Sequence, residues 1–142
     1  MIYKENSLQY EDYVNLRQSV QWKNMPKEQT IRALENSLYD VIAIDNEKVI
    51  AMGRLIGDGL YYIAVDIIVA PEYQNKGIGS EIISRLLTYA YSQTPLGGRI
   101  SIQLIAEKGK EAFYEKFGFK RIPHEYCGSG MRKVINKSIN LP

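Results

Sequence analysis

Residues 60–90 contain an apolar segment, a loop with two glycines and an amphipathic segment, and this succession limits the folds open to the chain. Leu60–Val69 is apolar and rich in β-branched side chains, which predicts a strand. From Ile78 onwards, apolar residues recur at helical spacing. Gly77 and Gly79 between these segments allow a sharp turn and a close approach of the backbone to a ligand.

The rest of the sequence predicts the other elements of a mixed α/β domain. A helix over residues 8–20 is expected to be capped by Ser7 or Asn6, and Pro26 suits the first turn of a second helix. Tight turns join the first three strands, which predicts an antiparallel meander. The expected strands are 41–44, 49–56, 60–69, 99–105, 119–122 and 131–135, and two further helices are expected from Ile78 and over 110–117.

Length and composition favour one domain over residues 1–142. A hydrophobic fraction of 45% and a charged fraction of 24% exclude disorder, collagen and a disulfide scaffold as the main description. The net charge of +2 gives no reason to expect a nucleic acid partner. The N-terminus does not resemble a signal peptide, and the most apolar window is too short to span a membrane. We therefore expect a cytoplasmic protein with no membrane partner.

The loop over residues 74–80 predicts an anion site, because the first N–H groups of a helix lack internal partners and the helix dipole is positive there. Taken alone, Gly-x-Gly before a helix also fits a turn without a ligand. Two known phosphate loops are excluded. Gly79 is followed by Ser80-Glu81 instead of Lys-Ser/Thr, and Ile82 stands where a dinucleotide fingerprint needs its third glycine.

Two motifs in the right order give a resemblance to a known family. The loop Val69-x-Pro71-x-Tyr73-Gln74-x-Lys76-Gly77-Ile78-Gly79 resembles the acetyl-CoA loop of the GNAT superfamily of N-acetyltransferases. Further along, the segment Ala112–Phe119 resembles the second motif of that family, a tyrosine before a Gly-Phe helix exit. The resemblance covers essentially the whole chain and implies the GNAT fold, a mostly antiparallel mixed sheet flanked by helices.

The resemblance also implies how acetyl-CoA, the acyl donor, is held. The pantetheine arm would pair with main-chain groups of Ile67, Ile68 and Val69. The pyrophosphate would lie on the N–H groups of Gln74, Asn75, Lys76, Gly77, Ile78, Gly79 and Ser80. No metal is expected, since His124 and Cys127 alone do not make a zinc site, and a catalytic pairing of these two residues is disfavoured.

The same resemblance assigns chemistry to individual residues. Tyr114 would be the general acid that protonates the departing thiolate, although it could instead be only a half-buried aromatic residue. A backbone N–H near Val69 would polarise the thioester carbonyl. Asp66 could be the base or a carboxylate that hydrogen-bonds its neighbours, and we weigh the two equally. Tyr62 and Glu107 are lesser candidates, and Glu107 replaces an asparagine that commonly touches the cofactor.

The predicted function is direct transfer of an acetyl group to a primary amine, with a small molecule favoured over a protein as acceptor. Trp22, Asn24 and Tyr126 are candidate residues for the acceptor site. Two alternatives remain open, a non-catalytic acyl-CoA sensor of the same fold and a scaffold whose loop binds nothing. Dimers are common in the family, so the resemblance also allows a homodimer.

Overall fold

A computed structural model describes residues 1–138. The backbone forms two compact units, residues 1–105 and a second unit from Ala106 onwards. The first unit holds, in order, β1 (Ile2–Glu5), α1 (Tyr10–Ser19), α2 (Lys27–Glu35), β2 (Tyr39–Asp45), β3 (Lys48–Gly57), β4 (Tyr61–Val69), the 3₁₀ turn η1 (Pro71–Tyr73), α3 (Ile78–Ser92) and β5 (Ser101–Gln103). The second unit holds α4 (Glu111–Glu115). No helix in the described part of the chain is long and apolar enough to cross a membrane.

The first unit is built on one mixed sheet with the strand order β1-β2-β3-β4-β5. The first four strands are antiparallel, and β5 is parallel to β4. The connection from β4 through α3 to β5 is therefore the strand–helix–strand unit that the sequence predicts. These features confirm the predicted α/β class and its mostly antiparallel sheet.

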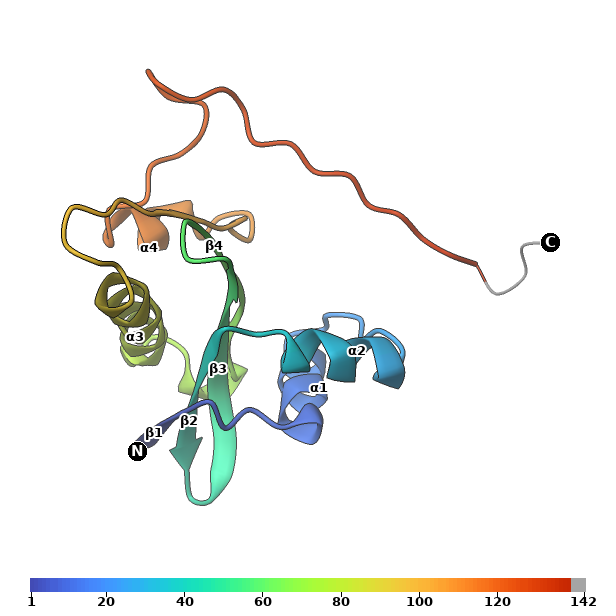
Figure 1. The fold of residues 1–142 in the computed structure, drawn as a ribbon. Helices are drawn as coiled ribbons and strands as arrows, with labels where there is room; N and C mark the ends of the chain where they lie inside the picture. Colours follow the sequence, from blue (N-terminus) through green and yellow to red (C-terminus); the bar gives the residue numbers. More distant parts are fainter. Residues whose placement is uncertain (139–142) are drawn as a thin grey trace. The chain divides into compact units, whose positions relative to one another are not determined.

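Helices cover both faces of this sheet, as Figure 1 shows. The contacts of α3 are with β2, β3 and β4, whereas α1 lies against β3 and β4 on the opposite face. Burial of apolar side chains between α3 and the sheet supplies most of the driving force for this packing. The largest fully buried side chains are Val41, Ile50, Met52, Leu55, Ile82, Ile83 and Leu86.

A bulge interrupts the pairing of β3 with β4. Met52 pairs with Ile68 but Arg54 pairs with Val65, so β4 has one more residue than β3 across this interval. Asp66 lies in the bulge with a left-handed backbone (φ 54°). A bulge of this kind turns the following residues and ends regular pairing. Beyond it, β4 has no partner in β5, because that pairing is confined to Tyr61–Ile63.

The second unit contains α4 and a longer segment without regular elements up to residue 138. Gly118, with φ 89°, ends the helical turn that follows α4, as the sequence predicts. The only β-type pairing among its described residues is the isolated bridge between His124 and Cys127.

Three expectations about the elements are wrong. The strand β1 was not expected, and it pairs with β2 along its four residues. The helix α1 begins at Tyr10 after Gln9, and neither Asn6 nor Ser7 caps it. Residues 119–122 and 131–135 form no strands. Apart from Phe119, which packs on Tyr114, their apolar side chains stay exposed, up to 95% for Met131, so no packing stabilises a ladder there.

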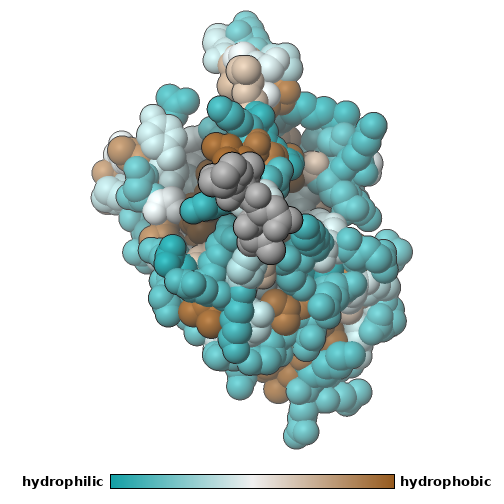
Figure 2. All heavy atoms as spheres, turned by 90° about the vertical axis from the view of Figure 1, so that its right-hand side faces the viewer, coloured by the Kyte–Doolittle hydropathy of each residue, from teal (hydrophilic) through white to brown (hydrophobic). Residues whose placement is uncertain are grey.

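Viewed from the side that carries α1 and α2 in Figure 1, the surface is mostly hydrophilic (Figure 2). Apolar residues show there as small separate patches. Scattered apolar residues are normal on a protein surface.

Candidate functional site

The loop before α3 forms an arc of free backbone donors. Asn75 and Gly77 have left-handed backbones (φ 62° and 83°), and Gly77 is the N-terminal cap of α3. In the described part of the chain, no acceptor is bound to the N–H groups of residues 75–80. Alternation of left-handed and right-handed residues makes such N–H groups converge on an anion. The dipole of the 15-residue α3 adds positive potential at the same place.

Side chains on both sides fix this loop. Tyr73 donates its hydroxyl to Oδ2 of Asp45 at 2.9 Å, which ties η1 to the end of β2. The side-chain amide of Gln74 donates to the carbonyl of Val69 at 3.0 Å. The N–H of Gln74 itself donates to the carbonyl of Pro71, so Gln74 differs from the other loop residues predicted to offer an N–H group. The ammonium of Lys76 lies 5.4 Å from the ring centroid of Tyr73.

The end of β4 offers main-chain groups beside this loop. Ala70 donates its N–H to Ile50 of β3 at 2.8 Å. Because facing residues of an antiparallel ladder alternate, the main-chain groups of Ile68 also face β3, and the N–H of Val69 faces the opposite edge. Three residues were predicted to pair with the pantetheine arm through their main chains. Of these, Val69 presents its N–H to the free edge, Ile68 does not, and Ile67 lies within the bulge.

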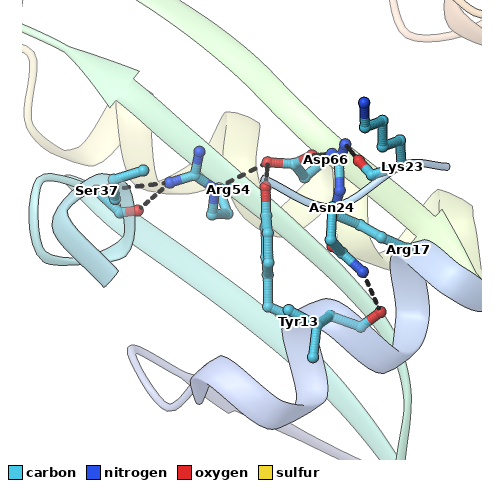
Figure 3. A network of polar contacts seen from close by, with 9 residues as sticks. Tyr13, Arg17, Lys23, Asn24, Ser37, Arg54 and Asp66 are labelled. Atoms are coloured by element: carbon cyan, nitrogen blue, oxygen red, sulfur yellow. Dashed lines mark hydrogen bonds and ion pairs between the residues drawn. The ribbon is translucent and has the colours of Figure 1, made fainter. Parts of the chain in front are cut away.

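The Asp66 side chain is enclosed by three donors from two elements (Figure 3). Its Oδ1 accepts a hydrogen bond from Arg17 at 2.8 Å. Its Oδ2 accepts from the Tyr13 hydroxyl at 2.9 Å and from Nε of Arg54 at 3.1 Å. The side chain of Asp66 is only 9% exposed, and those of Arg17 and Arg54 are 15% and 8% exposed. We call these four side chains, Tyr13, Arg17, Arg54 and Asp66, the Asp66 cage.

Further contacts hold the two arginines of the Asp66 cage. Nη1 of Arg54 donates to the Ser37 hydroxyl at 2.8 Å and to the carbonyl of Ala33 at 3.1 Å. Nη2 of Arg17 donates to the carbonyl of Lys23 at 2.6 Å. The Arg17 guanidinium also lies 5.5 Å from the Trp22 ring centroid, which gives Trp22 a structural contact. The cage therefore links β3 and β4 to both helices on this face of the sheet.

Burial and the nearby Asp66 carboxylate raise the pKa of Tyr13, although Arg17 and Arg54 act in the opposite direction. Tyr13 therefore keeps its proton and remains a hydrogen-bond donor to Asp66. Two roles were considered for Asp66, a base and a carboxylate that hydrogen-bonds its neighbours. These contacts are those of the second role. Tyr62, a lesser candidate for the base, is 2% exposed, and burial raises its pKa, so its phenolate form is disfavoured.

Tyr13, Arg17 and Arg54 are the residues of this site that the sequence analysis missed, and only Arg54 had a signal in the sequence. It stands in an otherwise apolar strand, as Asp66 does in the next one. Buried charges are almost always paired. Two opposite charges in adjacent apolar strands were therefore a signal that could have predicted their contact.

The second unit positions Tyr114 within a small aromatic cluster. The ring centroids of Tyr114 and Phe113 are 5.0 Å apart, and those of Tyr114 and Phe119 are 6.1 Å apart. Both pairs have an edge-to-face geometry. Burial raises the pKa of Tyr114, and the negative charge of Glu107 raises it further. The phenol therefore stays protonated at neutral pH, which is the form that a general acid requires.

Other predicted residues of the second unit are exposed. Tyr126 is 86% exposed, and Cys127 is also exposed, with its thiol donating to the carbonyl of Gly128 at 3.3 Å. His124 and Cys127 pair through their main chains. Within residues 1–138, no three His, Cys, Asp or Glu side chains gather into a set that could hold a metal ion.

The site thus combines a bulged strand that has a free edge with a loop of free N–H groups before a helix, in an α/β fold. The sequence model of the family described as "Acetyltransferase (GNAT) domain" matches residues 37–121, more than half of the chain. This chain belongs to the GNAT acetyltransferase family. The matched range includes the whole loop, Asp66 and Tyr114.

Individual relatives agree with this assignment. A GNAT-family acetyltransferase structure from Streptococcus pneumoniae is 30% identical with a TM-score of 0.78, and the alignment covers 96% of this chain and 98% of that one. An uncharacterized ycf52-like N-acetyltransferase of Prochlorococcus marinus is 29% identical over 113 residues, or 76% of this chain and 61% of that protein. GCN5-related N-acetyltransferase 2 (chloroplastic) of Arabidopsis thaliana is 27% identical, over 82% of this chain and 52% of that protein. The chain thus spans little more than half the length of these two curated relatives.

Proposed function

We propose that this protein transfers the acetyl group of acetyl-CoA directly to a primary amine, with a small molecule as acceptor. The observation that carries the proposal is the arc of free N–H groups over residues 75–80, which follows the part of β4 whose second edge has no partner in β5. An array of N–H groups at a helix start suits a diphosphate. The N–H of Val69 at the second edge of β4 suits a carbonyl oxygen of the donor's thioester arm. Coenzyme A carries both chemical features in one molecule.

The residues would divide the work in the following way. The N–H groups from Asn75 to Ser80 hold the pyrophosphate, and the Lys76 ammonium adds a positive charge beside them. The N–H of Val69 at the free edge donates to the thioester carbonyl oxygen as negative charge develops there. The amine then attacks the carbonyl carbon, the bond to sulfur breaks, the thiolate receives a proton, and the nitrogen releases its own proton to water. No covalent acyl-enzyme is required.

Tyr114 is the proposed donor of that proton. A thiol has a pKa of about 8.5 and a tyrosine of about 10, so the transfer needs only modest assistance. The raised pKa of Tyr114 makes it a somewhat weaker acid but keeps it protonated over the working range. We further propose that the two compact units act as one catalytic domain, since the family match runs through both.

The test measures thiol release from acetyl-CoA with a panel of amines, together with calorimetry of coenzyme A binding. Tyr114→Phe should lose most of kcat and keep its affinity for coenzyme A, because the lost proton is needed only in the transition state. Tyr91→Phe is the matched control, since Tyr91 is 81% exposed on α3. Unchanged turnover in Tyr114→Phe would remove this residue from the mechanism. Heat with coenzyme A but no thiol release with any amine would indicate a sensor instead.

A further inference from the structure

We propose that Asp66 is a positioning residue, whose enclosure by Tyr13, Arg17 and Arg54 holds the bulge of β4 and so directs the N–H of Val69 to the free edge. This inference rests on the proposed function for the consequence on donor binding. It concerns the backbone of β4, however, and that part can be tested without any ligand.

The first step is the backbone conformation of Asp66. Its φ of 54° lies in the left-handed region, which is unfavourable for a residue with a Cβ atom. Aspartate tolerates this region better than most residues, but such a conformation persists only when the surroundings impose it. At the bulge, no pairing with β3 fixes Asp66, because the register passes from Ile68 directly to Val65.

The second step is that the side chain supplies the missing constraint. Hydrogen bonds from Arg17, Arg54 and Tyr13 reach both carboxylate oxygens from two different elements, at 2.8 to 3.1 Å. Hydrogen bonds between charged groups are stronger than neutral ones, and this set is shielded from water. The donors are themselves immobilised, since Arg54 binds Ser37 and Arg17 binds the carbonyl of Lys23. The carboxylate is therefore fixed at three points.

The third step connects the bulge with the donor site. One extra residue in β4 changes which main-chain groups face β3 in the residues beyond it. With the bulge, Ile68 and Ala70 face β3 and Val69 faces the free edge. Without it, the register would slip by one residue and the N–H of Val69 would turn towards β3. The conformation of Asp66 therefore decides whether the free edge offers the N–H that the thioester needs.

The same contacts separate this role from that of a base. A base must offer a free oxygen to the amine that it deprotonates. Here Oδ1 is bound by Arg17, and Oδ2 is bound by both Tyr13 and Arg54. A positioning role and a base role also predict different kinetics, because the first acts on donor binding at every pH and the second on a single protonation step.

The experiment compares Asp66→Asn and Arg54→Gln with the parent protein in the pH range 6 to 9.5. We expect the KM for acetyl-CoA and the Kd for coenzyme A to rise about tenfold or more in both variants, by the same factor at each pH, because small misplacements of binding groups are costly. Arg54→Lys, which keeps the charge, should show an intermediate defect. Glu5→Gln is the matched control, since the Glu5 carboxylate also accepts a tyrosine hydroxyl, that of Tyr39 at 2.8 Å, but lies on β1, two strands away from Arg54.

A ligand-free measurement accompanies the kinetics. In Asp66→Asn, the amide of Ile68 should exchange its hydrogen about tenfold faster than in the parent, because its pairing with β3 depends on the bulge. This readout keeps the inference testable if the parent gives no heat with coenzyme A, a result that would overturn only the proposed function. If Asp66→Asn does not fold, Arg54→Lys provides both readouts.

Three results would overturn the positioning role. The first is a loss of kcat in Asp66→Asn that high pH rescues while the KM for acetyl-CoA stays within twofold, which would identify Asp66 as the base. The second is an equal defect in Glu5→Gln, which would indicate general destabilisation. The third is unchanged exchange of the Ile68 amide in Asp66→Asn.

Discussion

Gly53 of β3 lies directly against Ile82 of α3. A Cβ atom added at Gly53 would stand 2.6 Å from Cγ2 of Ile82 and 3.3 Å from Cδ1 of Leu86. Gly53 is also opposite the bulge, because the register of β3 with β4 passes from Met52 to Arg54. The absence of a side chain therefore lets α3 pack closely on the sheet at the position where β4 departs from regular pairing.

Replacement of Gly53 by alanine should lower the free energy of unfolding by about 1–3 kcal/mol, because the new methyl group overpacks the contact with Ile82. Urea unfolding followed by circular dichroism measures the change. Gly128→Ala is the control, since a Cβ there meets nothing within 4 Å. Equal stability of Gly53→Ala and the parent would mean that α3 moves away from the sheet at no cost.

Replacement of Gly77 by alanine should weaken the binding of coenzyme A in calorimetry. Gly77 has φ 83° at the start of α3, and a left-handed alanine costs about 1–2 kcal/mol, which the loop can avoid by changing shape. Gly59→Ala is the control, because it introduces a similar strain (φ 96°) in the turn between β3 and β4. A new Cβ at Gly59, like one at Gly77, meets open space. If both variants bind coenzyme A as the parent does, the loop does not hold the pyrophosphate.

Replacement of Glu107 by glutamine should lower the pKa of Tyr114. The Glu107 carboxylate raises this pKa because it disfavours the phenolate nearby, so removal of the charge acts downwards. Burial is the larger cause and remains, so the pKa of Tyr114 should stay above its ordinary value of about 10. NMR of ¹³C-labelled tyrosine measures it, with Tyr114→Phe to assign the resonance. A pKa that rises in Glu107→Gln would contradict this electrostatic picture.

Replacement of Asp40 by asparagine should change how stability depends on pH. Burial raises the pKa of Asp40 although it accepts the N–H groups of Ser7 and Leu8. A carboxyl group with a raised pKa in the folded state contributes most stability below the pKa of the unfolded chain, and loses that contribution as pH rises through the folded pKa. The free energy of unfolding of Asp40→Asn relative to the parent should therefore increase from pH 4 to pH 7. A difference that stays constant would show that Asp40 titrates alike in both states.

Elements with a strong local pattern could be predicted from the sequence. The apolar stripe of α3 starts at Ile78 in the structure as in the sequence, and β4 ends at Val69 as expected. Such elements bury one regular face, and their periodicity is visible without any knowledge of their partners. The start of the loop at the end of β4 could be predicted for the same reason.

Elements that depend on distant partners could not be predicted in this way. The strand β1 has only four residues and one half-buried side chain, so its sequence contains no alternation, and its stability comes from backbone pairing with β2. The reverse holds for residues 131–135, which were predicted as a closing strand and form none. Val134 and Ile135 remain 59% and 80% exposed, and a pattern without burial does not form a ladder.

The candidate site follows the same division. The loop over residues 75–80 could be predicted, because its glycines and the helix that follows are adjacent in the sequence. The Asp66 cage could not, since Arg17 and Tyr13 are 49 and 53 residues away from Asp66 in the sequence. Only the presence of opposite charges in β3 and β4 indicated that a partner was needed.

The short pairing of β4 with β5 has a consequence for how this protein can change over evolution. Peptide groups are common to nearly all residues, so a strand end that presents its N–H to a ligand keeps that capacity when its side chains are substituted. Under the proposed function, the side chain at position 69 could therefore vary, while selection on donor binding would act on backbone shape, through residues such as Gly53 and Arg54.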